Sequence, residues 1–220
     1  DRMAVSQGEQ TPSQVVVDIF EISSTDRVWK RTARVPVLIE DENMRNVGND
    51  RVGEPYVPSV SLSRDTLAVG LEKSVIIFTR DGDNKWIQRE KKTFITHVGQ
   101  LLVSLDGDTM VIADQYNSSS IFAYKRTSGQ VWTEEARMTI GDATDVSSWD
   151  QVAVALSGDT LVVSDVGGWG ENKKCHIIIF ERKGEGVWIR QRDVGTFVKQ
   201  ACPSPDRTYG LSLSGNTLAV

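Results

Sequence analysis

The stretch "VALSGDTLVV" (Val154–Val163) decides the fold, because its wording returns along the whole chain. Related phrases read "SLSRDTLAV", "SLDGDTMVI" and "SLSGNTLAV", and "DRMAV" opens the chain. Self-similarity of this kind is the sequence signature of a repeat architecture. The acidic or amide residue of the phrase recurs at intervals of 43 to 64 residues, at Asp1, Asp65, Asp108, Asp159 and Asn216.

A run of apolar and β-branched residues that ends in an aromatic residue follows each phrase, and a tryptophan comes eight or nine residues after that aromatic. This step is nearly constant, whereas the other intervals vary. A constant step indicates a tight structural unit, and variable intervals indicate loops that tolerate insertion. The runs are Val15–Phe20, Val75–Phe78, Ser120–Tyr124 and Ile177–Phe180, and the tryptophans are Trp29, Trp86, Trp132 and Trp188.

Four strands can be assigned within a repeat. "SVSLS" (Ser59–Ser63) alternates as a half-buried strand does, "RD" makes a two-residue hairpin turn, and "TLAVG" is the returning strand. "HIIIF" (His176–Phe180) is apolar without alternation, which predicts a strand buried on both faces. The strand that begins at each tryptophan, such as "WIQREKKT" (Trp86–Thr93), carries many charges, and this is typical of an exposed edge.

These units predict an all-β fold, a β-propeller of four-stranded antiparallel blades. A short sheet that is buried on both faces has to stack against its copies, and a ring of stacked four-stranded sheets is a propeller. We expect the four tryptophans to pack between neighbouring blades as structural anchors. Because the chain opens and closes in the same phase of the repeat, we expect a partial propeller with flanking repeats. The repeats span approximately residues 1–58, 59–102, 103–151 and 152–210, and residues 211–220 start a fifth.

The wording "VALSGDTLVV", then a loop, then "HIIIFERKGEGVWIRQ" resembles the FG-GAP repeat family, which includes the propeller of integrin α-subunits. The resemblance covers four repeats, essentially the whole chain, and implies an integrin-α-like β-propeller. The family's Phe-Gly position is filled by Trp149-Asp150 and Tyr209-Gly210, and its Gly-Ala-Pro position by pairs such as Gly70-Leu71. These departures indicate diverged repeats.

Many FG-GAP repeats carry a calcium loop of the D-x-D-x-D-G kind, and this chain has none. Two "DGD" triplets, Asp81–Asp83 and Asp106–Asp108, fall at predicted hairpin turns, and turn chemistry explains their aspartates. Cys175 and Cys202 form no C-x-x-C motif, so we expect no zinc site. The sequence does not decide whether these two cysteines are free thiols or form one disulfide. We therefore expect no metal and no cofactor.

Composition excludes several classes of function. The chain has 25 basic and 30 acidic residues spread along its length, a net charge of −5, and this argues against nucleic acid as a partner. No apolar run approaches the ~20 residues that span a bilayer, so we expect no membrane span. The two histidines, His97 and His176, are far apart in sequence, and no G-x-S-x-G motif is present. We expect a protein that is not an enzyme.

The loops between the second and third strands are the best candidates for binding. Propellers bind on the faces where such loops gather, and these loops hold aromatic and amide groups that suit protein or glycan contacts. The alternative, that these loops vary in sequence without any role in binding, stays open. Asn117 also begins the only N-x-[ST] sequon, in a predicted loop, and is the glycosylation candidate. The candidate binding residues are Asp114, Tyr116, Asn117, Asp165 and Trp169.

We therefore expect an interaction or adhesion module of a secreted or cell-surface protein that binds a protein or a glycan. One alternative is an accessory propeller of a larger enzyme, a hydrolase whose catalytic domain lies outside this chain. Another is a propeller enzyme of a different family, with its site in the central channel. Acidic or histidine side chains that converge on the channel mouth would favour that second alternative, because fold alone does not decide function.

Overall fold

The computed structural model describes residues 2–8, 14–38, 58–94, 100–114, 117–128, 130–140, 151–167, 174–191, 196–197, 211–215 and 217–219. Within these ranges every regular element is a β-strand. The same residues contain no helix of the length and apolar character that crossing a membrane requires.

The described strands form five antiparallel sheets, in which neighbouring strands follow chain order except that β16 pairs with β14. We call the sheets blades one to five. Blade one contains β1 (Arg2–Gly8), β2 (Gln14–Ile22) and β3 (Trp29–Leu38); blade two contains β4 (Ser59–Ser63), β5 (Thr66–Gly70), β6 (Ser74–Arg80) and β7 (Trp86–Thr93); blade three contains β8 (Leu101–Asp106), β9 (Thr109–Asp114), β10 (Asn117–Arg126) and β11 (Trp132–Met138); blade four contains β12 (Gln151–Ser157), β13 (Thr160–Gly167), β14 (Lys174–Gly184), β15 (Val187–Arg190) and β16 (Thr196–Phe197), which pairs with β14; blade five contains β17 (Ser212–Ser214) and β18 (Thr217–Ala219).

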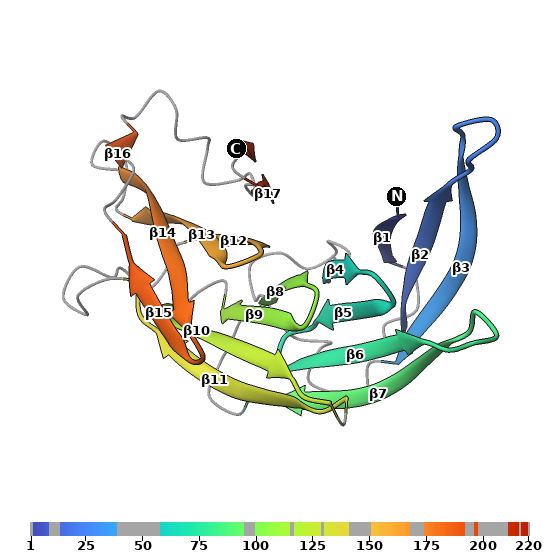
Figure 1. The fold of residues 1–220 in the computed structure, drawn as a ribbon, viewed down its shortest axis with the longest axis horizontal. Coiled ribbons are helices and arrows are strands. Elements are labelled where there is room, and N and C mark those ends of the chain that lie inside the picture. The colour runs from blue at the N-terminus through green and yellow to red at the C-terminus, as the bar shows by residue number, and fades with distance from the viewer. Residues whose placement is uncertain are drawn as a thin grey trace.

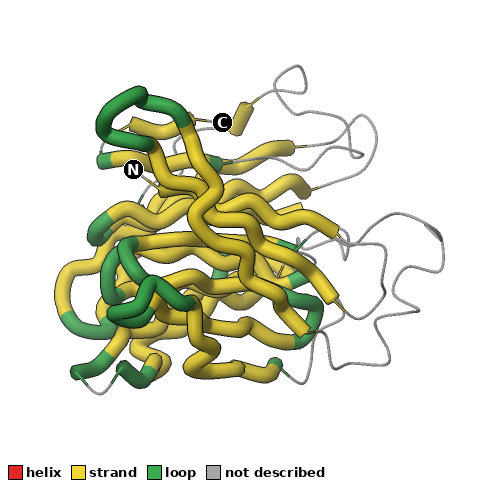
Figure 2. The backbone as a smooth tube through the Cα atoms, turned by 90° about the vertical axis from the view of Figure 1, so that its right-hand side faces the viewer, coloured by secondary structure: helices red, strands yellow, loops and turns green. Residues whose placement is uncertain are grey.

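The blades stand side by side around an open centre (Figure 1). The first strands β4, β8, β12 and β17 lie nearest the centre, and β3, β7, β11 and β15 lie at the outer rim (Figure 1). This arrangement confirms the predicted all-β fold, a partial β-propeller. It also puts the two ends of every strand on opposite sides of the arc. Figure 2 shows most of the described turns along one of these sides, on its left.

Burial follows the predicted gradient from inside to outside. Every residue of the second strands β5 and β9 is buried. The third strand of blade two, β6, is buried over its first five residues, and the fourth strand β7 is mostly exposed. Edge strands with charged side chains resist pairing with other chains. The predicted roles of the third and fourth strands are therefore confirmed in this blade.

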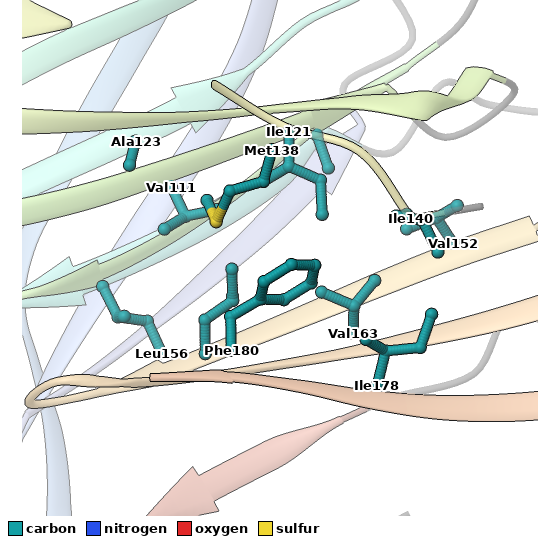
Figure 3. Packing of buried hydrophobic residues seen from close by; sticks show 12 residues of the cluster. Val111, Ile121, Ala123, Met138, Ile140, Val152, Leu156, Val163, Ile178 and Phe180 are labelled. Atoms are coloured by element: carbon teal, nitrogen blue, oxygen red, sulfur yellow. The ribbon is translucent and has the colours of Figure 1, made fainter. Parts of the chain in front are cut away.

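The core consists of apolar layers between neighbouring blades. Between blades three and four, Val111 and Ile121 face Leu156, Ile178 and Phe180 (Figure 3). Val111 and Ile121 are fully buried. Similar clusters join blade one to blade two and blade two to blade three. Since blades two and three contribute both of their faces to such layers, stacking on neighbouring blades stabilises these sheets.

The first hairpin of blades two, three and four is closed by a turn with one unusual backbone angle. In blade two, Ser63 pairs with Thr66, which leaves a two-residue turn at Arg64-Asp65. Arg64 has a φ of 52°, and Gly107 and Gly158 have a φ of 57° at the same position of their turns. A positive φ at the first central residue alone is the pattern of a type II′ turn, which favours glycine there. Blade two therefore holds an arginine in a conformation that suits glycine.

We expect Arg64→Gly to stabilise the protein by about 0.5–1 kcal/mol, because relief of the left-handed strain exceeds the added flexibility of the unfolded chain. Urea denaturation would measure the change. Lys85→Gly is the matched control, since Lys85 is an exposed cationic turn residue that is not among those with a positive φ. The control should lose stability, and a loss at both positions would contradict the assignment of strain to Arg64.

Candidate functional site

The predicted binding residues lie at the ends of second and third strands. Asp114 is the last residue of β9 and pairs with Asn117, the first residue of β10. Asp114 is only 2% exposed, so it is a buried strand residue and not the exposed loop residue that was predicted. Strand β9, which is buried over its whole length, continues through this position, where Leu101 of β8 lies opposite. Asp114 can therefore shape the adjacent loop but does not offer its own surface.

The remaining candidates are partly described. Asn117 lies in strand β10 and Asp165 in strand β13, opposite His176 of β14, so both strands extend further than the sequence predicts. The sequon thus begins in a strand and not in a loop. A register shift follows Asn117 in β10, which separates the start of this strand from its regular part. Tyr116 and Trp169 lie outside the described residues. The structure therefore brings Asp114 and Asn117 together at one end of blade three.

The repeated tryptophans are buried to very different degrees. Trp132 is 3% exposed, Trp86 and Trp188 are half-buried, and Trp29 is 42% exposed. Trp132 packs in the layer between blades two and three, which shows that it faces the blade before its own. Trp86 and Trp188 likewise pack against the layers toward blades one and three. Among the described residues no blade precedes blade one for Trp29 to pack against, so its role as an anchor stays a prediction.

The face of blade one that bears Trp29 also carries a buried charge. Asp18 of β2 is 1% exposed, and Arg34 of β3 donates to its two oxygens at 2.9 and 3.1 Å. Arg31 adds a longer contact of 3.5 Å. The residue two places before the final aromatic is Ile76, Phe122 or Ile178 in the later blades and Asp18 in blade one. The position that is apolar in the later blades is therefore occupied by a buried ion pair in blade one.

The hydrogen bonds from Arg34 hold the pKa of Asp18 below its ordinary value, although burial opposes the shift. A carboxylate with a lowered pKa stabilises the folded state above its unfolded pKa, about 3.9, and loses that effect as the pH falls toward the folded pKa. We expect Asp18→Asn to cost about 2 kcal/mol at pH 7, since hydrogen bonds to a charged group are lost. The difference from wild type should shrink below pH 4, as measured by denaturation at several pH values. A difference that stays constant down to pH 2 would contradict this role.

An arginine at the end of the third strand links neighbouring blades. In blade three, Arg126 Nε donates to Asp108 Oδ1 at 2.8 Å, and its Nη1 donates to Thr66 Oγ1 of blade two at 2.9 Å. Its guanidinium carbon lies 5.6 Å from the centre of the Trp132 ring, a cation–π contact. The hydrogen bonds from Arg126 lower the pKa of Asp108. One side chain thus ties a turn, an anchor tryptophan and the preceding blade together.

Blade four repeats this arrangement. Arg182 Nε donates to Asp159 Oδ1 at 2.7 Å, and Nη1 donates to Thr109 Oγ1 of blade three at 3.0 Å. Its guanidinium carbon lies 5.5 Å from the centre of the Trp188 ring. Glu135 accepts from Trp188 Nε1 at 3.2 Å. The Asp-Thr pair of the repeated phrase now has a physical reason: the aspartate binds the arginine of its own blade, and the threonine binds the arginine of the next.

The joint between blades one and two uses a variant of the same contacts. Arg2 stands where later phrases have threonine, and its Nη1 donates to Asp65 Oδ1 at 2.8 Å. Two arginines then approach each other, because Arg80 occupies the linking position. Glu21 lies between them, with contacts of 2.6 Å to Arg2 Nε and 2.8 Å to Arg80 Nη1. The added carboxylate compensates the arginine that replaces threonine.

A groove of about 570 Å³ lies between blades three and four, on the side of the first hairpins. Arg182 and Glu135 in its lining are already engaged in the blade-to-blade contacts. Lys125 and Glu185 add one charge of each sign, so the groove presents no single charge to a ligand. The lining residues are Lys125, Thr133, Glu135, Arg182, Gly184, Glu185 and Gly186.

The two "DGD" triplets lie in turns, as predicted. Asp81 Oδ1 accepts hydrogen bonds from the backbone N–H groups of Asp83 and Lys85 at 3.0 and 2.8 Å. Asp106 Oδ2 accepts from the backbone N–H of Gly158 at 2.6 Å. These carboxylates therefore have structural partners. Across the described ranges, no three acidic, histidine or cysteine side chains gather in a way that could hold a metal ion.

Sequence reasoning missed the linking arginines and a row of inner-strand serines. The signals were present: "IIFTR", "FAYKR" and "IIFER" all end in arginine, and "SVSLS" places serine at every second residue. The serines of β4 bond to backbone N–H groups of β8. These residues stabilise contacts between blades. A local sequence pattern shows that such residues recur, but it does not specify their partners in the neighbouring blade.

No family model matches the chain, and no curated protein does. The solved structure of a protein from Lactobacillus plantarum is similar, with a TM-score of 0.56 and 16% sequence identity. The match covers 86% of this chain and 56% of that protein, so the chain spans about half of its length. That protein has a propeller-like fold, and at this identity the likeness shows the fold alone.

Proposed function

We propose that this chain is a non-enzymatic interaction module, an FG-GAP-like propeller of a secreted or cell-surface protein. It binds a protein or a glycan through the connections between second and third strands. The observation that carries the proposal is the difference between the two sides of the arc. On the side of the first hairpins, Arg126 and Arg182 are engaged in bonds between blades. The other side receives the ends of β9 and β13, next to Tyr116 and Trp169 in sequence.

The residue types at that side support contact with a large polar partner. Aromatic rings give large contact areas at low entropic cost, and amides supply adaptable hydrogen bonds. A rigid scaffold beneath variable connections is also the usual setting for binding residues. Asp114, a buried residue at the end of β9, provides such a support.

The test is a binding screen with three forms of residues 1–220. Wild type, a Tyr116→Ala/Trp169→Ala variant and a Val131→Ser/Val187→Ser variant are applied to a glycan array and to a panel of purified extracellular proteins. Val131 and Val187 are 52% and 51% exposed, next to the hairpins of the opposite side, and they serve as the matched control. We expect a ligand whose affinity falls at least ~10-fold in the first variant, the loss expected when an aromatic hot spot is removed.

Two results would contradict the proposal. One is the absence of any ligand in both panels. The other is a ligand whose binding is weakened equally by both variants, because the connecting residues would then have no special part in recognition.

Glycosylation at Asn117 tests the proposed extracellular location. Secreted from a eukaryotic host, the protein should carry a glycan that glycosidase treatment removes. Asn117→Gln should abolish the accompanying shift in mass. A secreted protein of unmodified mass would count against the use of this sequon.

A further inference from the structure

The groove between blades three and four has a wall that is fixed by a close backbone contact. This wall includes the turn between β14 and β15, and Gly186 in the turn has a φ of 68°. A Cβ atom on Gly186 would lie 2.8 Å from the carbonyl oxygen of Glu135 in β11. The turn therefore rests directly on the backbone of blade three, and glycine is required for this approach. The contact fixes the position of the turn relative to blade three.

A lysine in this groove lacks the partner that its equivalent has in blade two. Lys125 follows the final aromatic residue of its run, and Glu135 comes three residues after the tryptophan of blade three. The equivalent residues of blade two are Thr79 and Arg89, and Arg89 Nε donates to Thr79 Oγ1 at 2.9 Å. Glu135 instead accepts hydrogen bonds from two side chains of blade four. In the described part of the chain, no hydrogen bond or ion pair engages the ammonium group of the half-buried Lys125.

Three acceptor groups share the groove with this free cation. Glu185 is exposed, and no described residue binds its carboxylate. The side-chain hydrogen bonds that Glu135 accepts from described residues all reach Oε1, which leaves Oε2 available. Thr133 Oγ1 donates to Lys125 O at 3.3 Å and can still accept a hydrogen bond. The groove thus offers one cation together with several acceptors for hydroxyl groups.

This combination selects a class of ligand. The described lining includes no apolar side chain, so the groove suits neither an aliphatic nor an aromatic ligand. A ligand with several negative charges would be repelled by the carboxylates of Glu135 and Glu185. The volume of about 570 Å³ lies within the ~300–1,000 Å³ of small-molecule sites. These groups match a ligand with a single carboxylate and several hydroxyl groups, which is the chemistry of an acidic sugar.

We propose that this groove binds an acidic monosaccharide. The carboxylate of the ligand accepts hydrogen bonds from the Lys125 ammonium group. Its hydroxyl groups donate to Glu185, to Glu135 Oε2 and to Thr133. The site lies on the side of the first hairpins, opposite the connections that carry the proposed function. The two proposals are therefore independent, and either can fail without the other.

The probe is D-glucuronate, and the matched control is D-glucose, which has a hydroxymethyl group in place of the carboxylate. NMR titration of ¹⁵N-labelled residues 1–220 measures both affinities and locates the site through the amides of Gly184, Glu185 and Gly186. We expect glucuronate to bind at least ~10-fold more tightly than glucose, because the control lacks the charge-assisted hydrogen bond. Acetate, which has a carboxylate but no hydroxyl groups, should also bind at least ~10-fold more weakly than glucuronate.

Two protein variants test the role of the lysine. Lys125→Met keeps most of the length of the side chain and removes its charge, and it should bind glucuronate no more tightly than glucose. Lys183→Met removes an equal charge close to the groove. Lys183 is exposed, pairs with Glu181 and is not part of the described lining. This variant should keep the wild-type preference for glucuronate.

Three results would overturn the proposal. The first is that wild type does not bind glucuronate, or binds it no more tightly than glucose or acetate, and this comparison decides the proposal even if a variant does not fold. The second is binding of glucuronate that leaves the amides of Gly184, Glu185 and Gly186 unshifted. The third is an equal loss of preference in Lys183→Met and Lys125→Met, because net charge and not Lys125 would then attract the anion.

Discussion

Gly70→Ala is expected to destabilise the protein by about 3 kcal/mol, the upper part of the usual range for overpacking a tight contact. Gly70 ends β5 where blade three crosses it. A Cβ atom at this position would lie 2.0 Å from the carbonyl oxygen of Leu101 and 3.2 Å from Val103 Cγ1. The backbone N–H of Leu101 bonds to Leu71 O at 2.9 Å, which fixes the obstructing residue against its neighbour. Relief of the clash therefore requires the two blades to separate.

Gly82→Ala is the matched control for this experiment. Nothing lies within 4 Å of a Cβ atom built on Gly82, and its φ is not in the left-handed region. Its effect should stay within about 0.5 kcal/mol. Guanidinium denaturation of both variants measures the difference. Similar midpoints for the two variants would show that blade three can shift at no cost.

The repeat alone would not have predicted a large effect at Gly70. The equivalent residues of blades three and four are Ala113 and Ser164, which already carry a Cβ atom. The blades therefore carry equivalent residues at the same positions of the repeat, but the distance from one blade to the next is not the same throughout. A clash of this kind depends on the distance to the next blade, and local sequence does not encode that distance.

What could be predicted from the sequence is what neighbouring residues determine. The predicted strands "SVSLS" and "WIQREKKT" coincide with β4 and β7, because alternation and turn residues are local signals. The predicted turn at "DGDN" is also present, and Asn84 adopts a φ of 63° there. Hairpins were therefore accessible to sequence reasoning before any contact between blades was known.

What could not be predicted depends on the partner across a blade interface. Asp114 was predicted to lie in a binding loop, but β9 continues through it. The serines of β4 read as the solvent side of an alternating strand, yet their hydroxyl groups bind blade three. Both errors have one cause, since a polar side chain between blades looks in sequence like a polar side chain in water.

Trp132→Ala is expected to cost about 3–5 kcal/mol, the usual loss when a buried aromatic residue is truncated and the cavity stays partly open. The ring is 3% exposed and packs in the layer between blades two and three. Truncation also removes the ring beneath Arg126, which links Asp108 and Thr66. Its backbone contacts to Glu90 and Lys92 would persist, so the measured loss reports on the ring.

Trp29→Ala is the control that separates position in the repeat from actual packing. Trp29 holds the same place in blade one but is 42% exposed. Its truncation should cost about 1 kcal/mol or less, because the burial that gives the hydrophobic contribution is incomplete. Denaturant midpoints, read with the slope of each transition, give both values. Equal losses would mean that the tryptophan stabilises each blade from within, and that stacking on the preceding blade is not the source of its contribution.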